Sequence, residues 1–236
     1  MENILLKYMV DRFNETDYVK HTQINNFPFI TISREYGCPS KDIALLIVQK
    51  MNSHLKLKNH LPSWRMINKE ILEETSKELK VDTKRIQKFF NIENRSTIEE
   101  ILTSLSDKYY HSNKKIKKTL SVIITDFAKI GNVVIVGRGG VCVTNNLKNG
   151  IHIRLTAPID WRAESIVQMK KATSIAEAKK LAEEIDFKRN ELLKIMSDNS
   201  YKDSFFDLTY NCQSFSKEEI AESIVYHLML KGKIKI

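Results

Sequence analysis

Hydrophobic and polar positions along the chain form two alternating kinds of segment, short apolar runs and longer stretches with helical spacing. The clearest apolar run is VVIV at 133–136, four consecutive β-branched residues that precede Gly-Arg-Gly-Gly. A continuous run of this kind predicts an interior strand of a parallel sheet that is covered on both faces. Further strands are predicted at 28–34, 64–68, 151–157 and 206–211.

The stretches between these runs have apolar residues three and four positions apart, which is the spacing of an amphipathic helix. They predict helices from about Asp42, over a long region from about 69 to 129, and at about 160–171 and 174–196. Ser216 and Glu219 have the pattern of a capping box at the start of a last helix. Strands that alternate with helices predict an α/β fold with a mostly parallel sheet and right-handed crossovers.

A length of 236 residues, with 42% hydrophobic and 28% charged residues, suits one sizeable domain with a small appendage and excludes wholesale disorder. No apolar run approaches the roughly 20 residues that cross a bilayer. Three widely spaced cysteines, Cys38, Cys142 and Cys212, form neither a metal pair nor a disulfide framework, so we expect a cytoplasmic protein. The net charge of +9 suits polyanionic partners, although a lysine-rich solvated surface gives the same sum.

Candidate binding residues follow the predicted strands, because ligands of parallel α/β sheets bind beyond the carboxyl ends of the strands. Three groups stand out: the loop SREYGCPSKDIA at 33–44, the glycines around Arg138, and the Asp186–Arg189 pair on one helix face. Each has an ordinary structural alternative, namely a strand–helix turn, a tight turn and a surface ion pair. The strand-end residues expected to converge are Ser33, Arg34, Gly37, Gly137, Arg138, Asn211 and Gln213.

In combination, these segments resemble the cytidylate kinase-like family of P-loop nucleoside monophosphate kinases. The resemblance is carried by ITISREYG, NKEILEE, VVIVGRGG, a strand ending in TAP followed by Arg162, the Asp186–Arg189 pair and FDLTYN, in that order over about 28–230. It implies a P-loop NTPase-type three-layer fold with a five-stranded parallel sheet, in a domain at 25–236. The resemblance does not cover residues 1–24, whose pattern predicts an N-terminal helical extension. It also implies a helical acceptor-binding insertion at about 60–130 and a lid at about 160–195.

The reaction that the resemblance implies is transfer of the γ-phosphoryl group of ATP, with Mg²⁺, to a nucleoside monophosphate, first of all CMP or dCMP. Lys41, Arg138 and Arg189 are the implied catalytic residues, and Arg162 is the implied lid contact to the donor nucleotide. Acceptor binding is implied for Arg34, Arg138, Asp186 and Arg189. ATP phosphate binding is implied for Gly37, Cys38, Pro39, Ser40, Lys41 and Asp42. Nucleotides are thus the expected partners, and neither a membrane nor nucleic acid is expected. No residue is assigned as a metal ligand.

The phosphate loop departs from the family pattern SREYGSGGREIA, because Cys38, Pro39 and Ser40 stand where the relatives have Ser-Gly-Gly. Pro39 removes a backbone N–H, and Asp42 stands at the usual magnesium-binding Ser or Thr position. Ser165 takes the place of a second lid arginine. These changes leave a second hypothesis open, a catalytically silent nucleotide-binding or regulatory protein. A nucleic-acid-binding protein ranks last, since basic and aromatic residues do not interleave.

Overall fold

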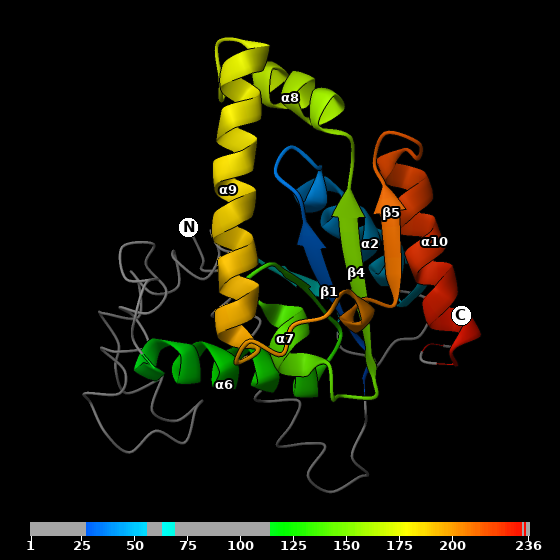
Figure 1. The fold of residues 1–236 in the computed structure, drawn as a ribbon. Helices are drawn as coiled ribbons and strands as arrows, with labels where there is room; N and C mark the ends of the chain where they lie inside the picture. Colours follow the sequence, from blue (N-terminus) through cyan, green and yellow to red (C-terminus); the bar gives the residue numbers. More distant parts are fainter. Residues whose placement is uncertain (1–26, 56–62, 69–113, 233, 235–236) are drawn as a thin grey trace, which may run out of the picture.

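Five parallel strands form one sheet at the centre of the molecule (Figure 1), in a computed structural model that describes residues 27–55, 63–68, 114–232 and 234. The strand order is β2-β3-β1-β4-β5. The strands are β1 (Phe29–Arg34), β2 (Arg65–Ile67), β3 (Val133–Val136), β4 (Gly150–Thr156) and β5 (Leu208–Asn211). The described helices are α2 (Ser40–Leu55), α6 (Lys114–Ile130), α7 (Gly140–Thr144), α8 (Ile159–Gln168), α9 (Ile175–Met196) and α10 (Lys217–Leu230), with a short 3-10 turn at Asp203–Phe205.

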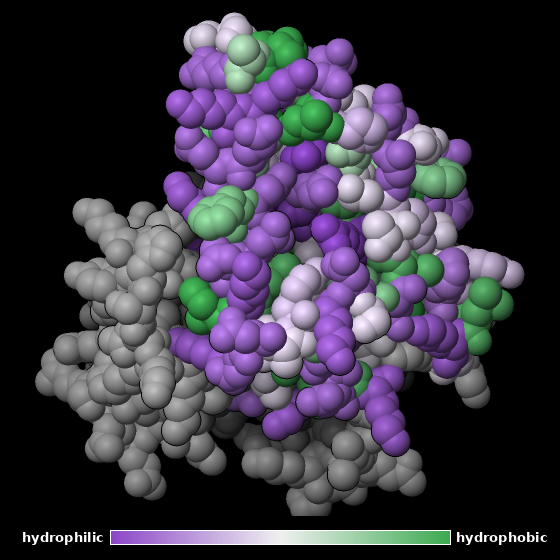
Figure 2. All heavy atoms as spheres, viewed as in Figure 1, coloured by the Kyte–Doolittle hydropathy of each residue, from purple (hydrophilic) through white to green (hydrophobic). Residues whose placement is uncertain are grey.

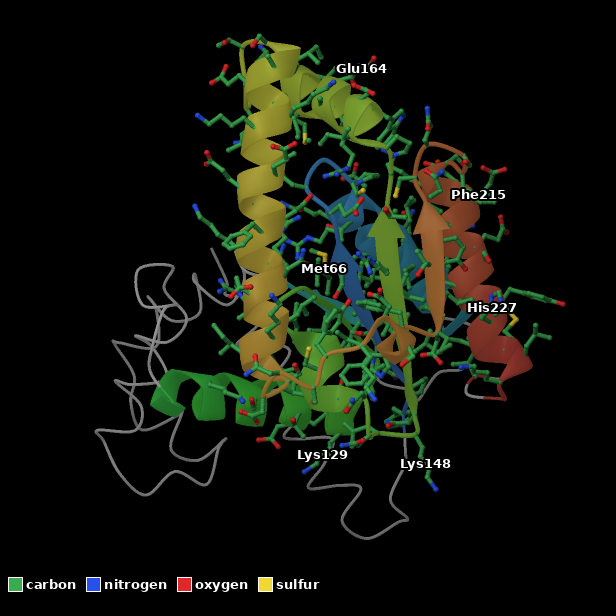
Figure 3. The ribbon with its side chains drawn as sticks, in the orientation of Figure 1. Met66, Lys129, Lys148, Glu164, Phe215 and His227 are labelled. Atoms are coloured by element: carbon green, nitrogen blue, oxygen red, sulfur yellow. The ribbon has the colours of Figure 1, made fainter. Side chains whose placement is uncertain are left out.

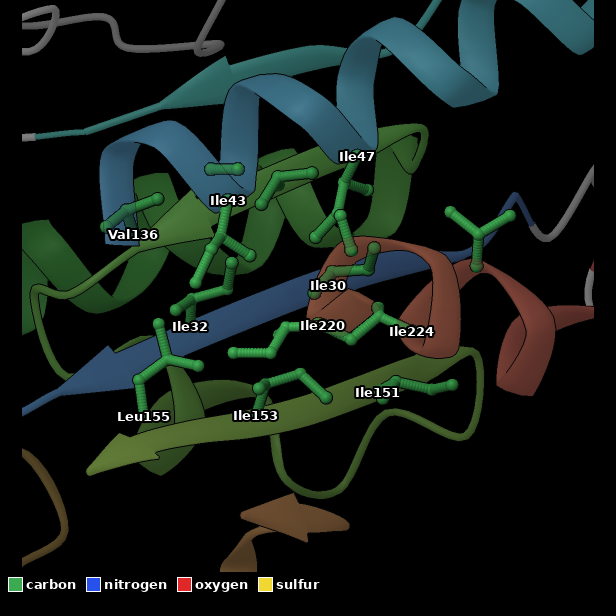
Figure 4. Close-up of a cluster of buried hydrophobic side chains, with 14 of the residues drawn as sticks. Ile30, Ile32, Ile43, Ile47, Val136, Ile151, Ile153, Leu155, Ile220 and Ile224 are labelled. Carbon is green, nitrogen blue, oxygen red and sulfur yellow. The ribbon is translucent and has the colours of Figure 1, made fainter. Parts of the chain in front are cut away.

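The two faces of the sheet carry different helices, because successive side chains of a strand point to opposite faces. Ile30 and Ile32 of β1, with Ile153 of β4, pack against α2 and α10, where the labelled isoleucines interdigitate (Figure 4). Phe29 of β1 points the other way and packs with Phe127 of α6 and with α7. The sheet is therefore buried on both sides, as a parallel sheet requires.

A long helix, α9, connects the two ends of the molecule on the α6 side (Figure 1). Small residues let it approach α8 closely, since Ala163 of α8 packs against Ala178 and Ala182 of α9. The other end of α9 reaches α7, where Met196 is buried among the residues of the second core cluster. Hydrophilic side chains cover most of the visible face of α9 (Figure 2). The helix thus spans the carboxyl edge of the sheet without being buried in it.

The parallel register brings the carboxyl ends of β1, β3 and β4 to the same edge of the sheet. Ile32 of β1 lies level with Val136 of β3 and with Ile153 of β4. Consequently the segments after β1 and after β3 begin side by side, although they are distant in the sequence. This edge is where the sequence predicts that binding residues converge.

The predicted α/β fold with a five-stranded parallel sheet is confirmed. The predicted strands at 28–34, 64–68, 133–136 and 206–211 each contain an observed strand, and the one at 151–157 overlaps β4 except for its first residue, Gly150. β5 begins at Leu208, later than expected, because Phe206 and Asp207 form the connection between the 3-10 turn at Asp203–Phe205 and the strand. Ser216 and Glu219 form the predicted capping box. The N-terminal extension at 1–24 and most of the predicted insertion at 60–130 lie outside the described residues. None of the described helices combines the length and the apolar character that a membrane span requires.

Candidate functional site

A pocket of about 610 Å³ lies between α9 and the carboxyl ends of β1 and β3. Side chains from the helix and from the strands meet in this space (Figure 3). Its four arginines come from four different places in the chain, namely Arg34 at the end of β1, Arg138 after β3, Arg154 in β4 and Arg189 in α9. With Lys188 they outnumber the acidic lining residues Glu35, Asp186 and Glu191. The pocket therefore favours an anionic ligand.

The turn after β3 has a strained backbone that places Arg138 in the pocket. Gly137, Arg138 and Gly139 have φ angles of 78°, 58° and 67°, all in the left-handed region. An arginine at such a φ costs roughly 1–2 kcal/mol, and strain of this kind is characteristic of functional sites. Arg138 is only 7% exposed. The turn is therefore built to hold a buried guanidinium at the edge of the sheet.

Gly137 also makes room for a second arginine of the pocket. A Cβ atom at this position would lie 2.2 Å from Nη1 of Arg34. Because two atoms cannot approach so closely, a side chain here would displace the Arg34 guanidinium. The φ of 78° already favours glycine at this position, and the missing Cβ also leaves room for the Arg34 guanidinium where it now lies.

Asp186 and Arg189 share one face of α9, as their spacing predicts, and both face the segment after β1. The Arg189 guanidinium donates to the carbonyl oxygen of Arg34 at 3.1 Å and lies 5.4 Å from the centre of the Tyr36 ring. Burial lowers the pKa of Arg189, and the neighbouring Asp186 carboxylate opposes that shift. The pair is therefore more than a surface ion pair, because it fixes α9 to the end of β1.

Arg162 of α8 is enclosed by acceptors of the protein itself. Its Nε donates to the carbonyl oxygen of Ala157 at 2.9 Å, and its Nη1 donates to the carbonyl oxygen of Tyr36 at 3.1 Å. Nη1 also forms an ion pair with Asp186 at 2.6 Å, and Glu35 lies 3.5 Å from Nε. The residue is 8% exposed. In this arrangement Arg162 holds α8, α9 and the loop after β1 together.

The loop after β1 uses its backbone N–H groups internally. The N–H of Tyr36 donates to the Asp186 carboxylate at 2.7 Å. The N–H groups of Cys38 and Ser40 donate to the carbonyl oxygens of Glu35 and Cys38, at 3.3 and 2.9 Å. A proline at position 39 contributes no N–H. These groups therefore do not form an open anion cradle in this arrangement.

The packing of α8 on this loop leaves no room for a side chain at Gly37. Its φ is 97°, and a Cβ atom there would lie 2.9 Å from both Cβ and the carbonyl oxygen of Arg162. The hydroxyl of Ser165, one turn further along α8, donates to the carbonyl oxygen of Gly37 at 3.0 Å. Ser165 thus fastens the loop to α8.

Lys41 and Asp42 lie on the first turn of α2, outside the pocket. Both are exposed, and the Asp42 carboxylate accepts from Nζ of Lys217 on α10 at 3.2 Å. Among the residues that the structure describes, no three His, Cys, Asp or Glu side chains come together as a metal-binding group. With its carboxylate turned to a lysine, Asp42 does not fit the role of a Mg²⁺ ligand.

Cys38 and Cys212 are in contact where the loop after β1 meets the end of β5. The pKa of Cys38 is raised, mainly by a hydrogen bond between the two thiols and secondly by burial. The same hydrogen bond lowers the pKa of Cys212. Glu35 ties the same loop to the end of β4, since its carboxylate accepts from the Thr156 hydroxyl at 2.7 Å. Cys38 therefore contributes to the packing of this loop.

The structure brings six of the predicted residues into one pocket and leaves the others outside it. The six are Ser33, Arg34, Gly137, Arg138, Asp186 and Arg189. Of the predicted strand-end residues, Asn211 and Gln213 instead bond to each other, with the Gln213 N–H donating to the Asn211 side chain at 3.0 Å. The residues outside the pocket are Gly37, Cys38, Pro39, Ser40, Lys41, Asp42 and Arg162.

Sequence reasoning missed an aromatic side of the pocket. Tyr36, Tyr201 and Phe206 line it together with Arg154. Tyr36 lies two positions after Arg34 and directly before Gly37, both predicted strand-end residues, and this position was a usable signal. Tyr201 and Phe206 precede a strand instead of following one, so the rule that binding residues follow strands does not find them.

The sequence matches the cytidylate kinase-like family over residues 29–214. A search of curated proteins found none that matches this chain. Among solved structures, the crystal structure of an uncharacterized protein from Eubacterium ventriosum ATCC 27560 is similar, with a TM-score of 0.56 and 15% sequence identity. The similarity covers 86% of this chain and 98% of that chain, and at this identity it shows a shared fold.

Proposed function

Because the chain belongs to the cytidylate kinase-like family, we propose that its arginine-lined pocket binds a nucleoside monophosphate and that the protein transfers the γ-phosphoryl group of ATP to it. CMP and dCMP are the first acceptors to test. The observation that carries the proposal is the convergence of Arg34, Arg138 and Arg189, from three separate parts of the chain, on one pocket beside Asp186.

The arginines of the pocket can position an acceptor phosphate and neutralise its charge. The reaction needs positioning of the acceptor and neutralisation of charge, with little covalent help. Arginine provides both, because its planar guanidinium binds two phosphate oxygens at once. Arg34 and Arg138 would hold the acceptor phosphate at the edge of the sheet. Arg189, fixed against Tyr36 and the end of β1, would contact it from α9.

The donor side of the proposed reaction requires a different arrangement of the loop after β1. The N–H groups of Tyr36, Cys38 and Ser40 must leave their present acceptors before they can bind a triphosphate. This observation favours a second candidate function, nucleotide binding without transfer, in which the loop never opens. The hydrogen bond between Asp42 and Lys217 also favours this second function.

Two measurements separate these functions. The first is a coupled assay for ADP formation with ATP, Mg²⁺ and each of CMP, dCMP, UMP, AMP and GMP. The second is calorimetric binding of the same monophosphates. Turnover supports the kinase, and binding without turnover supports the silent protein. A protein that binds no monophosphate and forms no ADP refutes both.

A matched pair of variants locates the binding in the pocket. Arg138→Met keeps the length of a buried side chain but removes its charge, and a lost charged contact should weaken CMP binding at least about 10-fold. The control is Lys148→Met, which removes a charge that points away from the pocket near the start of β4 (Figure 3). Equal effects of the two substitutions would show that only net charge matters.

A further inference from the structure

The aromatic end of the pocket, lined by Tyr201, Phe206 and Arg154, lies two strands away from Arg138. Arg138 follows β3, whereas Arg154 projects from β4 and Phe206 precedes β5. The strand order places β1 between β3 and β4, so two strand spacings, about 10 Å, separate the two ends. Arg34, at the end of β1, lies between them, so the pocket is basic from β3 to β1 and adds aromatic rings to a guanidinium near β4 and β5.

Three side chains at the aromatic end are fixed relative to one another. The Tyr201 and Phe206 rings pack edge to face, with centroids 6.3 Å apart at an angle of 70°. The Arg154 guanidinium lies 5.8 Å from the centre of the Phe206 ring. All three are only partly buried and line the pocket, so each keeps part of its surface available to a ligand.

Asp203 holds two of these side chains in place. Its carboxylate accepts from Nη1 of Arg154 at 2.7 Å and from the hydroxyl of Tyr201 at 2.9 Å. Burial and the bond to Asp203 raise the pKa of Tyr201 to about 12, so the phenol remains a neutral donor at physiological pH. Rings held in this way lose little freedom when a flat ligand stacks on them.

We propose that Tyr201, Phe206 and Arg154 form a base-binding shelf, on which the nucleobase of the acceptor stacks while its phosphate is held by Arg34, Arg138 and Arg189. This inference rests on the proposed function, because it concerns the same pocket and the same class of ligand. A nucleoside monophosphate has a flat aromatic group at one end and a doubly charged phosphate at the other, so it complements both ends of the pocket. Base–aromatic stacking and an adjacent guanidinium are common means of holding a base.

Phe205, the neighbour of Phe206 in the sequence, provides a control for the shelf. Phe205 also packs edge to face on Tyr201, at 6.0 Å, and it belongs to the same apolar cluster as Phe206. Only Phe206 lines the pocket. Phe206→Leu and Phe205→Leu therefore remove the same ring from the same cluster, and only the first removes a surface from the site.

The test compares calorimetric binding of CMP and of ribose 5-phosphate, which lacks the base, to the full chain and to the two variants. We expect Phe206→Leu to weaken CMP binding roughly 10-fold, the usual worth of one stacked base, and to leave ribose 5-phosphate binding unchanged. Phe205→Leu should change neither, and Phe206→Tyr should retain CMP binding. Thermal unfolding of each variant confirms that it is folded.

Several results would overturn the shelf. Equal CMP affinity in Phe206→Leu and Phe205→Leu would show that the ring is packing alone. A loss of ribose 5-phosphate binding as large as the loss of CMP binding would show that the substitution disturbs the phosphate end. Equal affinity of the unmodified protein for CMP and for ribose 5-phosphate would show that the base is not recognised, although the pocket would still bind an anion. If neither ligand nor any other monophosphate binds, the proposed function itself fails.

Discussion

Arg162 of α8 and Asp186 of α9 form a buried ion pair at 2.6 Å that also closes the loop after β1. The same carboxylate accepts the N–H of Tyr36, and the same guanidinium donates to the carbonyl oxygen of Tyr36. One residue of the loop is thus clamped from both of its backbone polar groups. Any movement of Tyr36 away from this position has to break both bonds.

The first prediction concerns the stability of this clamp. Arg162→Met removes the shorter of the two ion pairs of Asp186 and leaves the more distant Arg189 at 3.5 Å. The loss of this charged contact should lower the free energy of unfolding by about 2 kcal/mol. Urea unfolding measures the loss. The control is Lys194→Met, which breaks an exposed pair with Glu191 on α9 and should cost less than about 1 kcal/mol. Similar losses in both variants would show that the clamp contributes no more than a surface pair.

Much of the fold follows from local pattern in the sequence. The run at 133–136 is continuous and β-branched, and it forms an interior strand with every residue buried. Ser174 and Ser216 have the side chains and spacings of N-caps, and both cap helices. Each of these features depends on residues that are neighbours in the chain, which is why one sequence suffices to find them.

The candidate site follows from the sequence only in part. Arg34 and Arg138 could be found because both lie at strand ends, and parallel register brings strand ends together. The partners of Arg162 could not be found, because hydrogen bonds to Ala157 and Tyr36 depend on how α8 packs on the loop. The internal bonding of the loop itself depends on the same packing. Sequence pattern indicates which residues reach the edge of the sheet, and tertiary packing decides which of them face the pocket.

The second prediction tests whether Gly137 is required by Arg34. Gly137→Ala would place a methyl group against the Arg34 guanidinium, so we expect CMP binding to weaken at least about 10-fold, as for loss of a charged contact. Gly232→Ala is the matched control, because Gly232 has a φ of 64° and an added methyl group there would meet no atom within 4 Å. Both variants carry similar backbone strain, so an equal effect on binding would contradict the steric explanation.

The third prediction concerns thiol reactivity. Burial raises the pKa of Cys142 to about 11 from 9.0, and its thiol donates to the carbonyl oxygen of Leu193 at 3.4 Å. Because the thiolate is the reactive form, alkylation of Cys142 at pH 8 should be roughly 100-fold slower in the folded protein than in urea. Mass spectrometry after timed iodoacetamide treatment measures this at each cysteine. Equal rates in the folded and unfolded protein would contradict the predicted burial effect.

The last prediction follows from Asp207, which links β4 to the C-terminal helix. Burial raises the pKa of Asp207. The hydrogen bonds from the N–H of His152 at 2.8 Å and from Nζ of Lys231 at 2.9 Å lower it by more, so the net shift is downward from 3.8. A lowered pKa in the folded state means that the ionised carboxylate stabilises the fold above pH 3.8. That contribution is lost as the pH falls through the folded-state pKa.

Asp207→Asn should therefore lower the free energy of unfolding by about 1 kcal/mol at pH 5 to 7, with a smaller difference from the unmodified protein at pH 3. Urea unfolding at pH 7, 5 and 3 measures the difference. Asp160→Asn is the control, since Asp160 forms an exposed ion pair with Lys179 and should change stability by less than about 0.5 kcal/mol at each pH. A difference for Asp207→Asn that is the same at pH 3 and pH 7 would mean that the charge of this carboxylate does not stabilise the fold.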